Sequence, residues 1–224
     1  MRHTAVMTYR AVFLAALLAS PLAAQTCTED AMIVFDGSGS MAEVGFNLFN
    51  EPRIFEARRA VGSIIPEIAD VRRLGLVVYG PGGADGCSGL DLRFGPVENA
   101  APRIIDAVDR LQPEGDTPLT EAVRLAARAL NGAGAVVVIT DGKETCGGQP
   151  CQLATDLGRG VTVHVIGYKV RGDFFDWDTP GETVTVETVA RCLADRTGGH
   201  YVSTETVDEL VAALRQTMGC GLMF

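Results

Sequence analysis

Three oxygen-bearing side chains stand at alternate positions directly after a short apolar segment. Residues 31–35 are apolar, and Asp36, Ser38 and Ser40 follow them with glycines in between. Glycine lets the backbone turn sharply, so we expect the three side chains to converge on one point. A carboxylate and two hydroxyls are hard oxygen ligands, which suit Mg²⁺ or Mn²⁺, with Ca²⁺ as a further possibility, better than zinc or copper.

Three ligands do not complete an octahedral shell, and two later segments offer more oxygen atoms. Thr117 lies in the segment 115–120, just before a predicted helix. Asp141 ends a second apolar run that begins at Val136 and reads as a buried strand. Thr117 and Asp141 are therefore the candidates for the remaining protein ligands.

The motifs D-x-S-x-S, T-P-L and T-D-G, in this order, resemble the von Willebrand factor A (VWA) family, and the resemblance covers nearly all of the chain after residue 27. It implies a metal-ion-dependent adhesion site (MIDAS) formed by five residues: Asp36, Ser38, Ser40, Thr117 and Asp141. Hydroxyls dominate this set, so a divalent cation would stay poorly neutralised. The resemblance therefore implies a binding module that takes a Glu or Asp carboxylate from a protein partner.

The segment 140–151 resembles a bacterial VWA subgroup whose members are often described as homologues of calcium-activated chloride channel proteins. No channel activity is inferred, because no later segment approaches the roughly 18 apolar residues of a membrane span.

Strands and helices that alternate along the chain must position these ligands. We expect strands at 31–35, 74–79, 90–94, 136–140, 161–167 and 200–203. We expect helices at 54–69, with Pro66 kinking or ending it, and at 104–111, 118–130, 153–158, 184–197 and 207–218. This order predicts a doubly wound α/β fold: a mainly parallel six-stranded sheet, one antiparallel edge strand, and helices on both faces. Ligands bind such sheets outside the carboxyl ends of the strands, where Asp36 and Asp141 fall.

Residues 1–24 have the features of a secretory signal: a positive start, a short apolar core and small residues before a cleavage point after Ala24. We expect one mature VWA domain at 25–224, exported to the periplasm or secreted. Losing Arg2 and Arg10 moves the formal charge from −9 to −11, which argues against nucleic acid or an anionic membrane as partner.

All six cysteines follow the signal, so an exported chain should form disulfides. Pairing Cys146 with Cys151 would force Cys87 to meet Cys192 across the sheet. The layout is strained less by three other pairs: Cys27–Cys220, Cys87–Cys146 and Cys151–Cys192.

Several features have competing interpretations. Phe46, Phe49 and Trp177 could contact a partner, but packing against the domain is the simpler explanation. Lys143 and Glu144 follow Asp141 and could reach the site, or could form a solvated loop.

Other functions remain as alternatives. Residues 37–42 fit the G-x-G-x-x-A dinucleotide fingerprint, but the following segment looks like a loop, and the acidic residue expected after the second strand is missing. A metal-dependent hydrolase would need a base or nucleophile near the metal, and neither His164 nor His200 belongs to such a motif. A third alternative is a disulfide-stabilised structural domain with a vestigial metal site.

Overall fold

The structure, a computed structural model, describes residues 27, 29–44, 50–169 and 186–220. Its strands are β1 (Ala31–Asp36), β2 (Leu74–Tyr79), β3 (Leu90–Val97), β4 (Gly134–Thr140), β5 (Val161–Tyr168) and β6 (Tyr201–Thr204). Its helices are the 3₁₀ turn η1 (Gly39–Ala42), α1 (Arg53–Ala69), α2 (Ala101–Asp109), α3 (Leu119–Ala129), α4 (Pro150–Asp156), α5 (Val186–Thr197) and α6 (Val207–Met218). The predicted signal at 1–24 lies outside the described residues.

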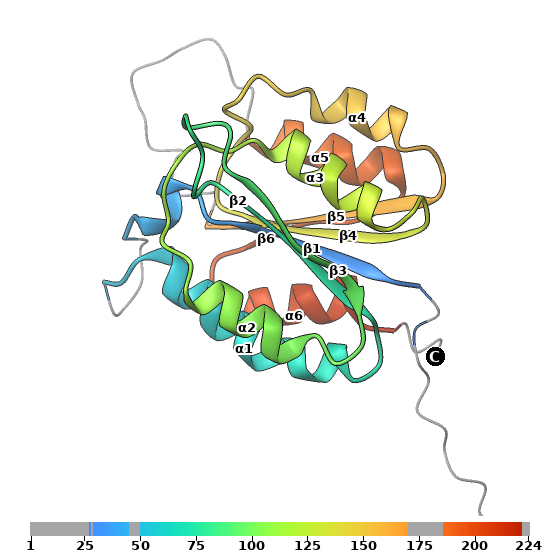
Figure 1. Ribbon diagram of the computed structural model, residues 1–224, viewed down its shortest axis with the longest axis horizontal. Helices are drawn as coiled ribbons and strands as arrows, with labels where there is room; N and C mark the ends of the chain where they lie inside the picture. The colour runs from blue at the N-terminus through green and yellow to red at the C-terminus, as the bar shows by residue number, and fades with distance from the viewer. Residues whose placement is uncertain (1–26, 28, 45–49, 170–185, 221–224) are drawn as a thin grey trace, which may run out of the picture.

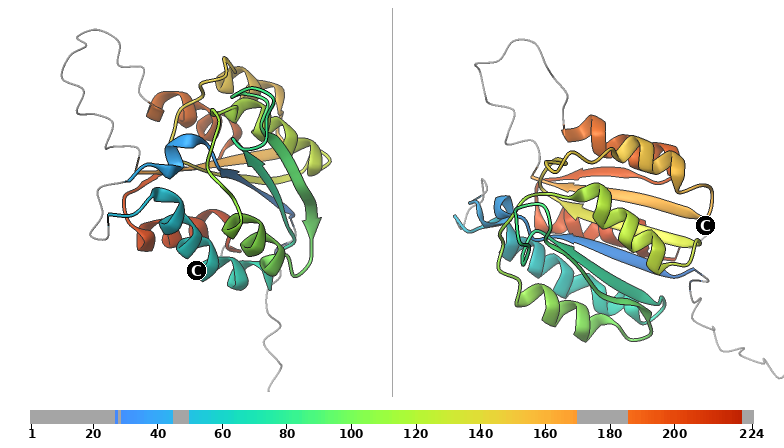
Figure 2. Two further views of the ribbon diagram at one scale, coloured as in Figure 1. Left: turned by 60° about the vertical axis from the view of Figure 1, so that its left-hand side comes forward. Right: turned by 45° about the horizontal axis from the view of Figure 1, so that its top comes forward.

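The six strands form one sheet in the order β3-β2-β1-β4-β5-β6. Only β3 runs antiparallel to its neighbour, β2, so the predicted mixed sheet with one antiparallel edge strand is confirmed. Helices α1, α2 and α6 cover one face, and α3, α4 and α5 cover the other (Figures 1 and 2). Each layer of helices buries its own apolar cluster against the sheet, which makes β1 and β4 the doubly covered centre.

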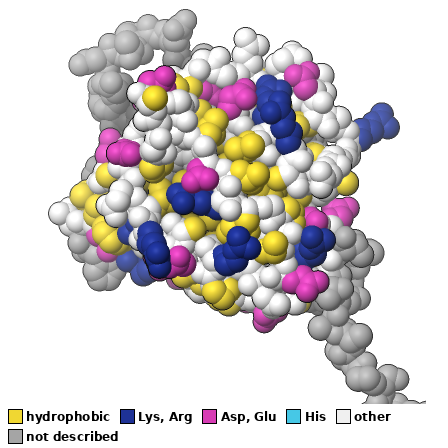
Figure 3. Space-filling view, viewed as in Figure 1, with side chains coloured by type: hydrophobic (Ala, Val, Ile, Leu, Met, Phe, Trp, Pro, Cys, Tyr) yellow, Lys and Arg dark blue, Asp and Glu magenta, His cyan; other side chains and the backbone are white. Residues whose placement is uncertain are grey.

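Strands β1 and β4 are buried at every position, as their unbroken apolar runs predict. Edge strand β3 is mostly exposed or half-buried and carries an Asp91–Arg93 ion pair at 3.1 Å. Charged side chains on an edge strand discourage pairing with another chain. On the face shown in Figure 3, basic and acidic side chains are interspersed around the apolar atoms.

Proline accounts for the largest differences from the expected helix starts. Helices α2 and α4 begin three residues earlier than predicted, and both have a proline in their first turn. Proline fits there because the first turn needs no amide donor. Helix α1 continues through Pro66 to Ala69, and the carbonyl that loses its donor belongs to Gly62, on the exposed side of the helix where water can serve it.

Three disulfides link distant parts of the chain, in the pairs that the predicted layout favoured. Cys27–Cys220 joins the segment before β1 to the segment just after α6, and Cys151–Cys192 joins α4 to α5. Cys87–Cys146 joins the loops that follow β2 and β4. Among the described helices, none is both long and apolar enough to cross a membrane.

Candidate metal centre

The candidate site lies at the carboxyl ends of β1 and β4. These two strands are parallel neighbours in the middle of the sheet, with Phe35 opposite Ile139. After β1 the chain winds outward through β2 and β3, and after β4 it winds the other way through β5 and β6. The winding therefore reverses between the neighbouring strands β1 and β4, and ligands of an open α/β sheet usually bind at the carboxyl ends of such a pair.

Hydroxyl groups connect the carboxylates of the two strand ends. The Ser38 amide and hydroxyl both donate to Asp36 Oδ1, at 2.8 and 2.6 Å. Ser38 Oγ lies 3.0 Å from Ser40 Oγ, and the Ser40 hydroxyl donates to Asp141 Oδ1 at 2.7 Å. Four of the five predicted ligands are thus joined side chain to side chain.

The other oxygen of Asp36 is held from below by two buried residues that the sequence did not single out. The Thr140 hydroxyl donates to Asp36 Oδ2 at 2.6 Å, and the Tyr79 hydroxyl donates to Thr140 Oγ1 at 3.0 Å. Burial, and then the charge of Asp36, raises the pKa of Tyr79 well above its ordinary value, so Tyr79 remains a neutral donor. This chain of hydrogen bonds fixes the orientation of the Asp36 carboxylate.

Close backbone approach positions the loop that carries the serines. A Cβ at Gly37 would meet Leu111 Cδ2 at 2.3 Å and the Tyr79 carbonyl oxygen at 2.9 Å. Gly80, at φ +104°, packs directly against Gly37, where a Cβ would come within 2.6 Å of the backbone. Glycine is required at both positions, and the loops after β1 and β2 therefore lock together.

Thr117 reaches the same place from the loop before α3. Its hydroxyl and that of Ser40 flank Gly142, at 3.5 and 3.7 Å from the position a Cβ would take there. The Thr117 amide donates to Thr145 Oγ1 at 2.8 Å, and the Thr145 amide donates to the Thr117 carbonyl at 3.2 Å. The structure therefore brings all five predicted ligands to one site.

A buried cation, Arg53, also belongs to this site. Arg53 opens α1, and its Nη1 lies 2.9 Å from Asp141 Oδ2. Burial, with the Asp36 charge second, raises the pKa of Asp141 to about 6, while hydrogen bonds from Ser40 and Arg53 oppose the rise. The sequence offered no sign of this residue, because nothing around it distinguishes it from a surface arginine.

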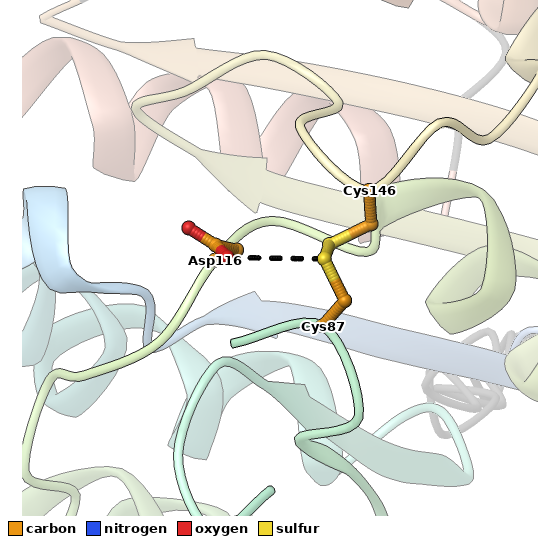
Figure 4. A group of neighbouring side chains, drawn as sticks. All are labelled: Cys87, Asp116 and Cys146. Atoms are coloured by element: carbon orange, nitrogen blue, oxygen red, sulfur yellow. Dashed lines mark hydrogen bonds between the residues drawn. A yellow bond between two sulfur atoms is a disulfide. The ribbon is translucent and has the colours of Figure 1, made fainter. Parts of the chain in front are cut away.

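The Cys87–Cys146 disulfide sits beside the Thr117 loop. Asp116 Oδ2 lies 3.8 Å from Cys87 Sγ (Figure 4), a contact rather than a hydrogen bond because a disulfide sulfur has no proton to donate. Although these three side chains cluster, the bonded sulfurs are not thiolate ligands, so the group does not form a second metal site. The disulfide instead ties together the loops on either side of Thr117.

The remaining predicted contact residues fall in different places. Glu144 is half-buried and occupied within the chain: its Oε2 accepts from the Thr120 amide and hydroxyl, and its Oε1 accepts from the Cys146 amide. Lys143 is exposed beside the site. The other three candidates lie outside the described residues: Phe46, Phe49 and Trp177.

Comparison with known proteins decides the family. The von Willebrand factor type A domain profile matches residues 31–144, just over half of the chain and all five candidate ligands. The chain belongs to the VWA family.

Relatives and structural neighbours of this VWA chain are bacterial and animal proteins. The Bacillus subtilis protein YwmD, itself uncharacterised, is 29% identical over 197 residues and 81% of each chain. The conserved hypothetical protein BatB from Bacteroides thetaiotaomicron shares the fold with a TM-score of 0.62, at 19% identity, over 84% of this chain and 96% of that one. Proximal thread matrix protein 1 of the mussel byssus, with a zinc-occupied MIDAS motif, aligns with a TM-score of 0.52 and 17% identity, over 85% of this chain and 44% of that one.

The residues of this VWA chain suit a divalent cation. Two carboxylates lie close together at 0% and 1% exposure, and one buried guanidinium, that of Arg53, pairs with Asp141. Such a pair is costly to keep charged without more positive charge, which a divalent ion would supply. Ser40, the least buried of the five ligands, gives the site its opening to solvent.

Proposed function

We propose that this chain is an exported VWA binding module, and not an enzyme. A divalent cation, Mg²⁺ or Mn²⁺, would be held by five oxygen-bearing residues: Asp36, Ser38, Ser40, Thr117 and Asp141. Through that ion the module would engage a Glu or Asp carboxylate on a protein partner. The mature module would be residues 25–224, released after removal of the signal at 1–24.

The proposal rests on the hydrogen-bonded set that links Asp36, Ser38, Ser40 and Asp141 across the switch point. These oxygens already lie close to one another. A hard cation would bind to the oxygens directly, and the hydroxyl groups would keep their protons but give up some of the hydrogen bonds between them. Asp36 and Asp141 carry two negative charges, but Asp141 already pairs with Arg53, so the two carboxylates neutralise a divalent ion incompletely. The ion would therefore retain affinity for one more anionic oxygen, which a partner can supply at the Ser40 opening.

Two observations favour binding over hydrolysis. His164 pairs in register with Val137, three residues before the end of β4, and so lies about 10 Å below the site at the usual strand rise. Its Nδ1 accepts from the His200 amide at 3.1 Å, which occupies it in a structural contact. The charged residues that follow Asp141 directly are also unsuited to catalysis. Lys143 is exposed to solvent, and Glu144 accepts a hydrogen bond from Thr120 of α3.

Thermal unfolding of the mature protein with EDTA, Mg²⁺, Mn²⁺ or Ca²⁺, together with calorimetric titration of each metal, tests the cation. We expect the unfolding midpoint to rise with Mg²⁺ or Mn²⁺, by the equivalent of about 2.7 kcal/mol at a hundredfold excess over the dissociation constant. Asp36→Ala and Ser38→Ala should abolish the rise and the heat of binding. The matched controls Asp195→Ala and Ser63→Ala change exposed residues on α5 and α1 and should keep both.

Absence of a metal response in the wild type would refute the proposed cation. Turnover of a phosphate or acyl ester that stops on Asp141→Ala would show an enzyme instead. For the partner, proteins captured in Mg²⁺ but not in EDTA would be retested with their exposed Glu and Asp changed to Gln and Asn. Capture that survives every such change would refute the carboxylate part of the proposal.

A further inference from the structure

Arg53 is a positive charge built into the metal site. Its side chain is 8% exposed and that of Asp141 is 0% exposed, so their 2.9 Å ion pair is shielded from water. Two further contacts of Arg53 Nη1, with the Ser40 carbonyl and with Glu43 Oε2, are longer at 3.5 Å, and Glu43 is 65% exposed. Of these three described contacts, the one with Asp141 is therefore the close and desolvated one.

The two oxygens of Asp141 divide their contacts. Oδ1 accepts from Ser40, on the side of the other metal ligands, and Oδ2 binds Arg53, on the side of α1. A carboxylate held in this way shares its charge between the guanidinium and whatever occupies the ligand cluster. A divalent ion would have to bind against a fixed positive charge only one carboxylate away.

Among the described residues, the other charges near the start of α1 do not offset Arg53. One turn along α1, Glu56 is buried and forms an ion pair with Lys169, so this pair adds no net charge. Glu43 is mostly in water, which screens it. Within the described part of the chain, the charge balance near the candidate ligands is thus set by Asp36, Asp141 and Arg53.

We propose that Arg53 is a positioning residue that holds Asp141 and limits how tightly the site binds a divalent cation. This inference rests on the proposed function. In the absence of metal, Arg53 stabilises the buried Asp141 carboxylate. With a divalent ion bound, the two carboxylates face three positive charges, which leaves the site net positive and favours an anionic group from the partner.

The test uses Arg53→Gln and Arg53→Lys in the mature protein, with Arg59→Gln as the matched control. Arg59 lies on the same helix and pairs with Glu51, away from the metal ligands. Titration calorimetry with Mg²⁺ and with Mn²⁺ measures the dissociation constant, and thermal unfolding in EDTA measures the stability of the metal-free protein.

We expect Arg53→Gln to lower the unfolding midpoint in EDTA, because Asp141 loses its partner. We expect the same variant to bind metal about tenfold or more tightly, because a charge repelling the ion is gone. Arg53→Lys keeps the charge and should bind metal more nearly as the wild type does. Arg59→Gln should change neither quantity.

The outcomes separate this inference from the proposed function. If the wild type binds metal and Arg53→Gln binds equally or more weakly, Arg53 is only structural and the inference is wrong, while the proposed cation site stands. If the wild type does not bind but Arg53→Gln does, Arg53 controls the site and the cation proposal fails for the natural chain. If no variant binds, both fail.

A second measurement covers the case in which Arg53→Gln does not fold. Side-chain ¹⁵N spectra of the wild type, with the Arg53 signal identified through Arg53→Lys, would be recorded during Mg²⁺ titration. We expect the Arg53 signal to shift in step with Mg²⁺ binding, because Asp141 would then share its negative charge with the ion as well as with Arg53. An unchanged Arg53 signal at full Mg²⁺ occupancy would overturn the inference.

Discussion

A change of Thr140 tests how buried hydrogen bonds hold the Asp36 carboxylate in place. Its hydroxyl donates to Asp36 Oδ2 and accepts from the buried Tyr79 hydroxyl, and Tyr79 is 0% exposed. Thr140→Val keeps the shape and removes the hydroxyl. Asp36 then loses a hydrogen bond to a charged group, and the Tyr79 hydroxyl is left buried with no acceptor at this position.

The two losses can be given magnitudes. A hydrogen bond to a charged group contributes about 1.5–3 kcal/mol, and an unsatisfied buried hydroxyl costs about 1–3 kcal/mol. We therefore expect Thr140→Val to lower the free energy of unfolding by about 3–5 kcal/mol. Tyr79→Phe removes only the donor at the far end of the chain and should cost about 1 kcal/mol.

The double variant, Thr140→Val with Tyr79→Phe, is the sharpest part of this prediction. Without the Tyr79 hydroxyl, no buried tyrosine donor is left unsatisfied, so the double variant should be more stable than additivity predicts, by about 1–3 kcal/mol. Urea unfolding in EDTA, which keeps metal out of the comparison, measures all three variants. An unchanged m-value would show that the unfolded states are comparable.

Thr217→Val is the matched control. Thr217 is also buried, at 4% exposure, but its hydroxyl donates to the Ala213 carbonyl within α6. Its loss leaves no charged group without a donor and should cost about 1 kcal/mol. If Thr140→Val costs no more than Thr217→Val, or if the double-variant energies simply add, the supporting role of Thr140 is refuted.

Two further predictions concern buried charge away from the metal ligands. Burial, and then the charge of His200, lowers the pKa of His164 to about 4, so the folded protein resists protonation of this side chain. The resulting contribution to stability is fully present above the ordinary pKa of 6.5 and is lost as pH falls towards 4. We expect that loss, about 1–2 kcal/mol after allowing for partial exposure, to disappear in His164→Gln. Glu56 accepts hydrogen bonds from Lys169 and Tyr168 in a buried cluster. Lys169→Met should cost about 3–5 kcal/mol, and adding Glu56→Gln should recover part of that cost because no unpaired charge remains.

Both are measured by urea unfolding, at several pH values for the histidine and at pH 7 for the ion pair. The difference between wild type and His164→Gln isolates the histidine from the carboxylates that also titrate. An identical pH dependence in the two proteins would contradict the assigned burial. For the ion pair, a double variant less stable than Lys169→Met would contradict the reasoning.

Much of the fold was predictable because its signals are local. The apolar runs of β1 and β4 can be stable only if covered on both faces, and the structure covers them. Helix α6 spans 207–218 as expected, and the structure shows why it starts there: Thr206 and Glu209 form a capping box. The starts of α2 and α4 were missed because the apolar pattern begins after the proline turn that opens each helix.

The sequence by itself determined the types and order of the candidate ligands and the strand ends that carry them, because motif spacing and apolar periodicity are properties of the chain alone. Only the tertiary structure decided what surrounds them. Thr140 and Tyr79 support Asp36, and Arg53 neutralises Asp141. The hydrogen-bonded partners in these contacts are 61 to 104 residues apart in the sequence. A buried charge depends on what faces it, and residues so far apart in sequence meet only after the sheet and helices have packed.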